Sequence, residues 1–160
     1  MQENGKGYNV IKSSAPGGEK EGEIMEEMQR DALSNSLMQQ ASKALSEAKR
    51  HLKDGAYTQA ADRGWDSMVL AMRSVLALDD ITEQEDLKAV EAFRQMYLKS
   101  EAMPSEWASL LDQMLQWKDR EKEGQQPLSK EQAGRMISRL QGFLQGAVDY
   151  LVQRNAPYWG

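Results

Sequence analysis

Apolar residues recur every three or four positions in this chain, most densely between Tyr57 and Leu78. That spacing puts them on one face of a helix. The first half of the segment is apolar on that face alone, at residues such as Ala60 and Gly64. From Trp65 onward apolar residues cover most of the girth. A helix that is hydrophobic on most sides is buried, so we expect this segment to be the central helix of the fold.

Four further segments follow the helical period, and no segment alternates with the period of two that is typical of a strand. Gly55 is expected to end the helix before the central one, because glycine readily adopts the left-handed conformation of a C-cap. Thr82 is expected to cap the third helix, and Ser129 with Gln132 to form a capping box for the last. The predicted helices are Leu33–Lys53, Thr58–Ala77, Thr82–Lys99, Ser105–Arg120 and Lys130–Arg154. The predicted fold class is all-α, an antiparallel four- to five-helix bundle with a flexible N-terminal tail.

The chain has 160 residues, enough for one domain with one core. Residues 1–22 are rich in Gly, Ser, Lys and Glu and cannot bury a core, so they are expected to be flexible. Within the next stretch, Glu23–Arg30 is expected to hold only a turn or two of helix. The predicted organisation is an acidic flexible tail over residues 1–32, a bundle over 33–154 and a C-terminal tail over 155–160.

The net charge of −5 is unevenly distributed. Residues 1–32 hold four bases and seven acids, and the remainder holds 16 bases and 18 acids. This near balance in the bundle argues against broad, non-specific nucleic-acid binding, which needs a basic surface. No apolar run approaches the roughly 18–20 residues of a membrane span, and the first residues lack a signal-peptide pattern. We therefore expect a cytoplasmic protein with no membrane association.

The reactive residue types are few. The chain has no cysteine, which excludes disulfides, thiolate metal sites and a cysteine nucleophile. Its single histidine, His51, has no partners at the spacing of metal ligands. We expect no metal, no cofactor and no catalytic residue.

The segment AKRHLKDGAYTQAADRGWDSMVLAMRSVLAL resembles part of a HEPN domain (higher eukaryotes and prokaryotes nucleotide-binding). The similarity is greatest to the small stand-alone form found beside minimal nucleotidyltransferases. It continues in order through LKAVEAFRQMYLKSEAMPSEWASLLDQMLQWKDRE and LSKEQAGRMISRLQGFLQGAVDYL, covering about Leu33 to Arg154. Asp66 departs from the pattern, since a second aromatic is usual there. The matching positions at the hairpin turn and in the central helix are Gly55, Tyr57, Ala60, Arg63 and Trp65.

The resemblance implies a four- or five-helix bundle, frequently homodimeric, whose inter-helix cleft binds nucleotide or RNA. Many members are metal-independent ribonucleases that use an arginine followed four to six residues later by a histidine. Arg120 matches the arginine, but Gln125, Gln126 and Pro127 occupy the histidine positions. Neither residue type titrates near neutral pH, as general acid–base catalysis requires. The resemblance therefore implies a bundle without the nuclease pair.

The charges expected to line that cleft are on the central helix and at the end of the fourth. Arg63 and Asp66 are three residues apart and can also pair locally, as a solvated ion pair. The expected function is a non-catalytic binding or accessory protein, acting as a homodimer or in a hetero-complex. Its expected ligand is a nucleotide, RNA or a partner protein such as a nucleotidyltransferase. The candidate binding residues are Asp62, Arg63, Asp66, Asp119 and Arg120.

Three alternatives remain open from the sequence. The first is a metal-independent ribonuclease with a non-standard site at Arg120, including one in which His51 of a second copy supplies the missing base. The second is a structural accessory subunit of a larger enzyme complex, which would use the acidic tail and the terminal APYWG as arms. The third follows from GAYTQAA, which also resembles the turn of a tetratricopeptide hairpin, although no second copy follows at a 34-residue period.

Overall fold

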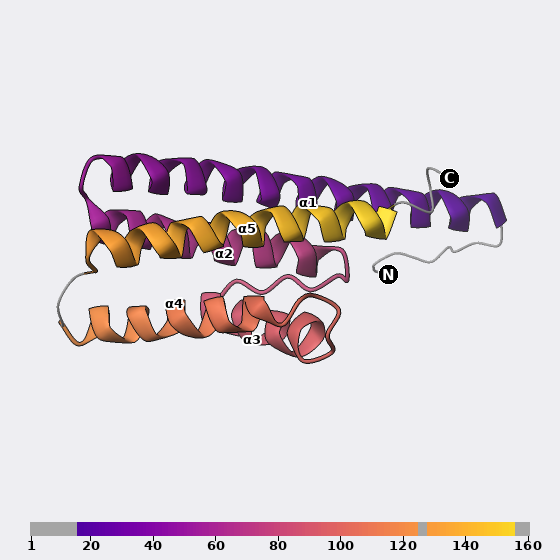
Figure 1. Ribbon diagram of the computed structural model, residues 1–160. Helices are drawn as coiled ribbons and strands as arrows, with labels where there is room; N and C mark the ends of the chain where they lie inside the picture. Colours follow the sequence, from indigo (N-terminus) through magenta and orange to yellow (C-terminus); the bar gives the residue numbers. More distant parts are fainter. Residues whose placement is uncertain (1–15, 125–127, 156–160) are drawn as a thin grey trace.

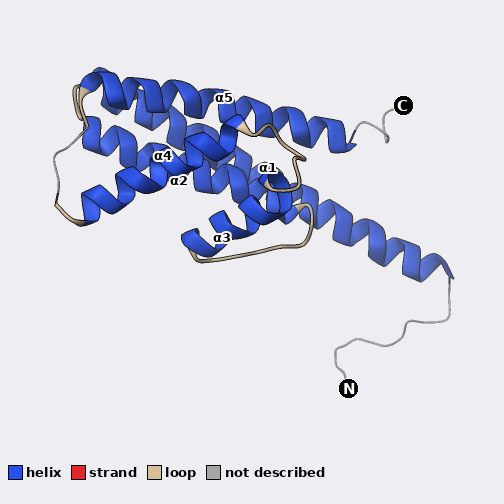
Figure 2. Cartoon of the chain, turned by 60° about the horizontal axis from the view of Figure 1, so that its bottom comes forward, coloured by secondary structure: helices blue, strands red, loops and turns tan. Residues whose placement is uncertain are grey.

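The computed structural model describes residues 16–124 and 128–155, with the side chains of residues 26–124 and 128–154. Within these ranges the chain is helical and contains no β-strand, which confirms the all-α prediction (Figure 2). The expected tails at residues 1–15 and 156–160 lie outside the described residues. The elements are α1 (Pro16–Lys53), α2 (Tyr57–Ala77), α3 (Asp86–Phe93), the π-helix η1 (Arg94–Leu98), α4 (Glu106–Lys122) and α5 (Lys130–Asn155).

The three long helices run alongside one another and each contacts the other two, with α2 and α5 antiparallel to α1 (Figure 1). Helices α3 and α4 lie against α2 and α5 on the side away from α1 (Figure 1). The N-terminal end of α1 extends beyond α2 and α5. The turn between α1 and α2 is made by Gly55 at a φ of 79°, which confirms it as the helix end. The amide of Ala56 donates to the carbonyl of His51 at 2.9 Å, satisfying a free carbonyl of the last turn.

Helix α2 is buried along most of its length, as its apolar pattern predicts. Its Met68 and Met72 are fully buried, and unbranched methionines fill such irregular spaces well. Helix α3 is joined to α5 by Phe93 and Phe143, whose rings meet edge to face at 5.9 Å between centroids. Other side chains with almost no exposed surface are Val69, Val75, Leu76, Leu110, Leu111, Met114 and Leu140.

The indole of Trp107 lies over two glycines of α5. A Cβ added at Gly142 would be 3.2 Å from the Trp107 ring, and one added at Gly146 would be 3.3 Å from it. The two glycines therefore let α4 approach α5 more closely than alanine would. Around Gly134 nothing lies within 4 Å of an added Cβ, so this glycine has no such role.

The first helix is longer than predicted, since it begins at Pro16 rather than near Leu33. Proline is favourable in the first turn of a helix, and the following Glu, Met and Gln residues are good helix formers. The composition predicts flexibility up to residue 22 and only a turn or two of helix over Glu23–Arg30, so the continuous helix from Pro16 differs from the prediction. In the structure Arg30 of this stretch pairs with Asp80 at 3.1 Å, which attaches it to the turn that follows α2.

The third helix is shorter than predicted, since α3 begins at Asp86 and not at Thr82. Arg73 explains this, because its guanidinium donates to the carbonyls of Glu83 at 3.0 Å and Gln84 at 2.6 Å. Those contacts keep the segment before α3 non-helical, and Glu85 at the N-cap position has extended backbone. The expected cap at Thr82 is therefore wrong.

The remaining helix ends agree with the prediction within two residues, since α2, α4 and α5 begin or end close to the expected positions. The capping box of α5 is also present. The Ser129 amide donates to the Gln132 side chain at 2.9 Å, and the Gln132 amide donates to the Ser129 hydroxyl at 3.1 Å.

Candidate functional site

The five predicted binding residues lie on two helices that meet. Asp62, Arg63 and Asp66 are half-buried on one flank of α2, whereas Asp119 and Arg120 are exposed near the C-terminal end of α4. Lys118 of α4 connects the two groups, with its ammonium 3.9 Å from a carboxylate oxygen of Asp62.

Between these helices and the start of α3 lies a groove of about 380 Å³. Of the five predicted residues, Asp66 and Asp119 line it, but the other three, Asp62, Arg63 and Arg120, do not. The sequence analysis missed the contribution of α3, because nothing in the local pattern predicts where Asp86 and Leu87 pack. The groove is lined by Trp65, Asp66, Asp86, Leu87, Leu115, Lys118, Asp119, Glu121 and Lys122.

Arg63 is engaged on both edges of its guanidinium. One amino group donates to Asp66 at 2.7 Å, which confirms the predicted local pair. The Nε and the other amino group donate to Glu47 of α1, with Nε at 2.8 Å. The hydrogen bonds from Arg63 hold the pKa of the Glu47 carboxyl below its usual value. Arg63 therefore joins α1 to α2 instead of presenting an open cation.

Lys118 occupies a cation site made by two indoles and two carboxylates. Its ammonium is 5.7 Å from the ring centroid of Trp65 and 5.2 Å from that of Trp117, both within range of a cation–π interaction. It is also 3.9 Å from Asp62 and 3.5 Å from Glu121. Burial, together with the neighbouring Glu121 carboxylate, raises the pKa of the Asp62 carboxyl.

Arg120 is exposed and forms no ion pair with any residue between 26 and 124 or between 128 and 154. His51 is half-buried in the last turn of α1. No hydrogen bond joins these two side chains in the described part of the chain. Gln125, Gln126 and Pro127, where the resemblance would require the histidine, lie outside the described residues.

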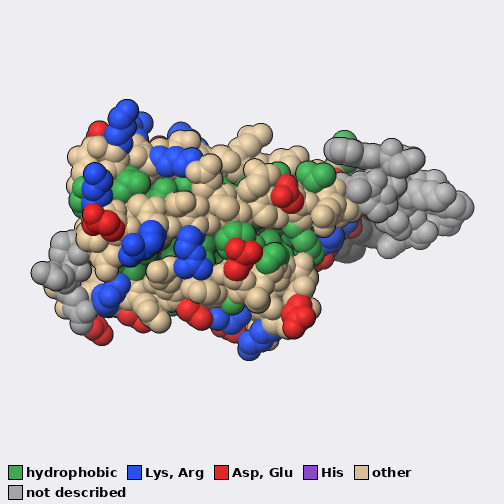
Figure 3. All heavy atoms as spheres, viewed as in Figure 1, with side chains coloured by type: hydrophobic (Ala, Val, Ile, Leu, Met, Phe, Trp, Pro, Cys, Tyr) green, Lys and Arg blue, Asp and Glu red, His purple; other side chains and the backbone are tan. Residues whose placement is uncertain are grey.

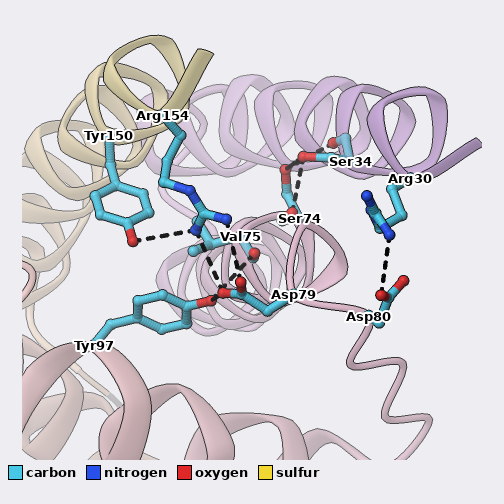
Figure 4. A network of polar contacts seen from close by, with 9 residues as sticks. All are labelled: Arg30, Ser34, Ser74, Val75, Asp79, Asp80, Tyr97, Tyr150 and Arg154. Carbon is cyan, nitrogen blue, oxygen red and sulfur yellow. Dashed lines mark hydrogen bonds and ion pairs between the residues drawn. The ribbon is translucent and has the colours of Figure 1, made fainter. Parts of the chain in front are cut away.

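A second polar cluster forms at the other end of α2, around Asp79 (Figure 4). Arg154 from the last turn of α5 donates to both carboxylate oxygens, at 3.2 and 3.4 Å. The hydroxyl of Tyr97 from η1 donates to the same carboxylate. The sequence predicts a break of the helix at Asp79 and Asp80, but it gives no signal that pairs residue 79 with residue 97 or 154.

The pKa of the Asp79 carboxyl is lowered by the residues around it. Burial raises this pKa, but the hydrogen bonds from Tyr97 and Arg154 outweigh it, so the pKa lies below its ordinary value of 3.8. Burial and the bond to Asp79 raise the pKa of Tyr97 above its usual range. Both groups are thus fixed in one protonation state near neutral pH. We interpret the cluster as a structural junction of α2, η1 and α5, because its charged groups satisfy one another.

Residues with metal-binding side chains do not gather in the described part of the chain: no group of three Asp, Glu or His residues there could hold an ion. Among the described helices, none is long and apolar enough to cross a membrane.

Comparisons with family models, with curated proteins and with solved structures give no match to this chain. The resemblance to the HEPN family therefore stays a prediction.

Proposed function

We propose that this chain is a non-catalytic, HEPN-like binding or accessory protein, and that its ligand is a segment of a partner protein. One observation carries the proposal: the groove between α2, α3 and α4 combines an exposed leucine with an excess of carboxylates. An apolar centre with a polar, solvent-accessible rim is a common composition of a surface that binds protein.

The apolar part of the groove is centred on Leu87. Its side chain is 63% exposed, the same fraction as Met28 and above the other exposed large hydrophobic residues of the described chain. It stands in the first turn of α3, beside Trp65 and Leu115. Trp65 is already buried, but an apolar side chain of a partner would remove Leu87 and the exposed part of Leu115 from water, and such burial stabilises a complex.

The charged part of the groove disfavours phosphate. Its lining contains four carboxylates and two ammonium groups. Asp62, Arg63 and Arg73 pair with this lining, and Glu47 pairs with Arg63. Including all four leaves the excess of two negative charges unchanged. Phosphate recognition requires a surplus of cations. A nucleotide or RNA in this groove would be repelled, whereas a basic protein segment would be attracted.

The proposal is tested by two charge-introducing substitutions of matched type. Leu87→Glu in the groove should abolish capture of a partner from lysate, whereas Val152→Glu should leave it unchanged. Val152 is 48% exposed and belongs to α5, away from the groove lining. Equal capture by both variants would contradict the groove as the binding surface. Light scattering of the purified chain then tells whether the bound partner is a second copy.

Catalysis is tested separately by incubating single-stranded RNA with the protein in the presence of chelator. We expect no cleavage, because the single histidine does not follow the arginine at the required spacing. Cleavage that both His51→Ala and Arg120→Ala abolish would instead support the ribonuclease alternative.

A second candidate function is binding of nucleotide or RNA, at α5 rather than at Arg63. Arg139 donates to the neutral side chain of Gln113 at 2.6 Å, so its charge is not neutralised by this contact. Arg135, one turn earlier, is exposed. Lys and Arg side chains are visible along α5 and α1 on this face, beside a strip of hydrophobic groups (Figure 3). If this face binds phosphate, Arg135→Gln with Arg139→Gln should weaken RNA binding and lower its salt dependence.

A further inference from the structure

We propose that Trp65, Trp117, Asp62 and Glu121 form a receptor for an organic cation, which Lys118 fills in the free protein. We infer that a lysine side chain of the partner segment displaces Lys118 and takes its place. This inference rests on the proposed function, since it names the chemistry by which the groove selects a protein segment.

The geometry is that of an ammonium site. Two indole rings lie within 6 Å of the Lys118 ammonium, at 5.7 Å for Trp65 and 5.2 Å for Trp117. Tryptophan is the side chain that interacts best with a cation through its ring face. Two carboxylates, from Asp62 and Glu121, lie on the same ammonium. Aromatic faces attract organic cations, and carboxylates pair with ammonium groups.

The two carboxylates explain why the site requires a cation. Asp62 and Glu121 are close enough for their mutual repulsion to raise the pKa of Asp62, in addition to the effect of burial. Lys118 partly offsets this repulsion. Without an ammonium between them, two like charges would face each other beside the indole rings, which is unfavourable. Lys118 can therefore leave easily only when another cation replaces it.

Lys118 is held loosely enough to be displaced. Its ammonium is 3.5 and 3.9 Å from the two carboxylates, beyond the 2.7–2.9 Å of a strong charge-assisted hydrogen bond. Arg63, in contrast, contacts Asp66 at 2.7 Å. The Lys118 side chain is 34% exposed, and it lines the groove, so a route for exchange lies next to it. Its flexible stem lets it swing into solvent.

The local sequence pattern does not predict this site. Trp117 and Lys118 are adjacent in α4, and Trp65 is on α2, so only packing of the two helices brings both rings onto one ammonium.

The experiment measures binding of a hexalysine peptide to the full chain by calorimetry, with a fully acetylated hexalysine as the control ligand. Lys118→Gln empties the site, and Lys122→Gln removes one charge from the same groove lining without opening it. We expect Lys118→Gln to bind hexalysine about fivefold more tightly than Lys122→Gln does, the size of one exposed cation–π contact. Adding Glu121→Gln to Lys118→Gln should cancel the gain, and the acetylated peptide should not bind.

Equal gains in the two lysine variants would overturn the inference, since net charge alone would then explain them. Absence of hexalysine binding to Lys118→Gln, in a variant whose urea midpoint matches the parent, would overturn it as well. Either result leaves the proposed function intact if Leu87→Glu still abolishes partner capture. Loss of the Leu87 effect, in contrast, would contradict the proposed function even where hexalysine binds.

Discussion

The phenol of Tyr97 donates a hydrogen bond to the carboxylate of Asp79, joining the π-helix η1 to the end of α2. The same carboxylate accepts two hydrogen bonds from Arg154, 75 residues away in sequence. A π-helix shifts the side chains that follow it around the helix axis. Tyr97, in that π-turn, is only 2% exposed. Asp79 thus connects three segments, α2, η1 and α5.

The Asp79 junction is expected to stabilise the fold by a modest amount. Tyr97→Phe should lower the free energy of unfolding by about 1 kcal/mol, the usual loss for one hydrogen bond. Arg154→Met should cost a similar amount, since solvent screens a side chain that is 36% exposed. The double variant should cost more than the sum, because each single variant keeps one donor to Asp79 and the double variant keeps neither. Urea denaturation measures all three, and strict additivity would contradict the shared junction.

The junction should also make stability depend on pH. Because the folded-state pKa of Asp79 is below its ordinary value of 3.8, its contribution is present above that value. The contribution is lost as the pH falls through the lower, folded-state pKa. Asp79→Asn should therefore be less stable than the parent at pH 7, and the difference should shrink steadily below pH ~4. A difference in unfolding free energy that stays constant from pH 7 to the most acidic folded condition would contradict this.

Replacing Gly134 and Gly142 of α5 by alanine should change the free energy of unfolding in opposite directions. Gly134→Ala is expected to raise the free energy of unfolding by about 0.5–1 kcal/mol, because the added methyl meets open space and alanine favours the helix. Gly142→Ala should bring no gain or a loss, since its methyl would lie 3.2 Å from the Trp107 ring. That ring is held edge to face against Phe143 at 5.6 Å, which limits how far it can move. Thermal unfolding of the two variants tests the contrast, and equal stabilisation would contradict it.

A buried serine pair holds α1 against α2. The Ser34 hydroxyl donates to the Ser74 carbonyl at 2.8 Å, and the Ser74 hydroxyl donates to the Ser34 carbonyl at 2.7 Å. Ser34→Ala and Ser74→Ala should each cost about 1 kcal/mol of unfolding free energy. Ser42→Ala, at an exposed position on the same helix, is the matched control and should cost nothing. A loss at Ser42 as large as at Ser34 would contradict the role of the pair, because alanine favours the helix and propensity alone would bring a small gain.

The candidate site could be predicted only in part. The sequence identified Asp66 and Asp119 as site residues and predicted the pair of Arg63 with Asp66. It did not find Glu47, which accepts hydrogen bonds from the other edge of the Arg63 guanidinium. It also missed Leu87, whose exposed side chain gives the groove its apolar part. Both omissions involve residues on other helices, 16 or more positions away. Their positions depend on how the helices pack, which the local pattern does not determine.

Local sequence was enough to predict the helical class, the buried central helix, the turn at Gly55 and the capping box at Ser129, because each depends on residues within one or two turns of each other. Packing between the helices sets where α3 begins, because Arg73 binds the carbonyls of Glu83 and Gln84. It also decided which charges remain open, since Arg63 and Arg154 are engaged by carboxylates from distant segments. Such pairs form only when the packed apolar faces have set the register of the helices.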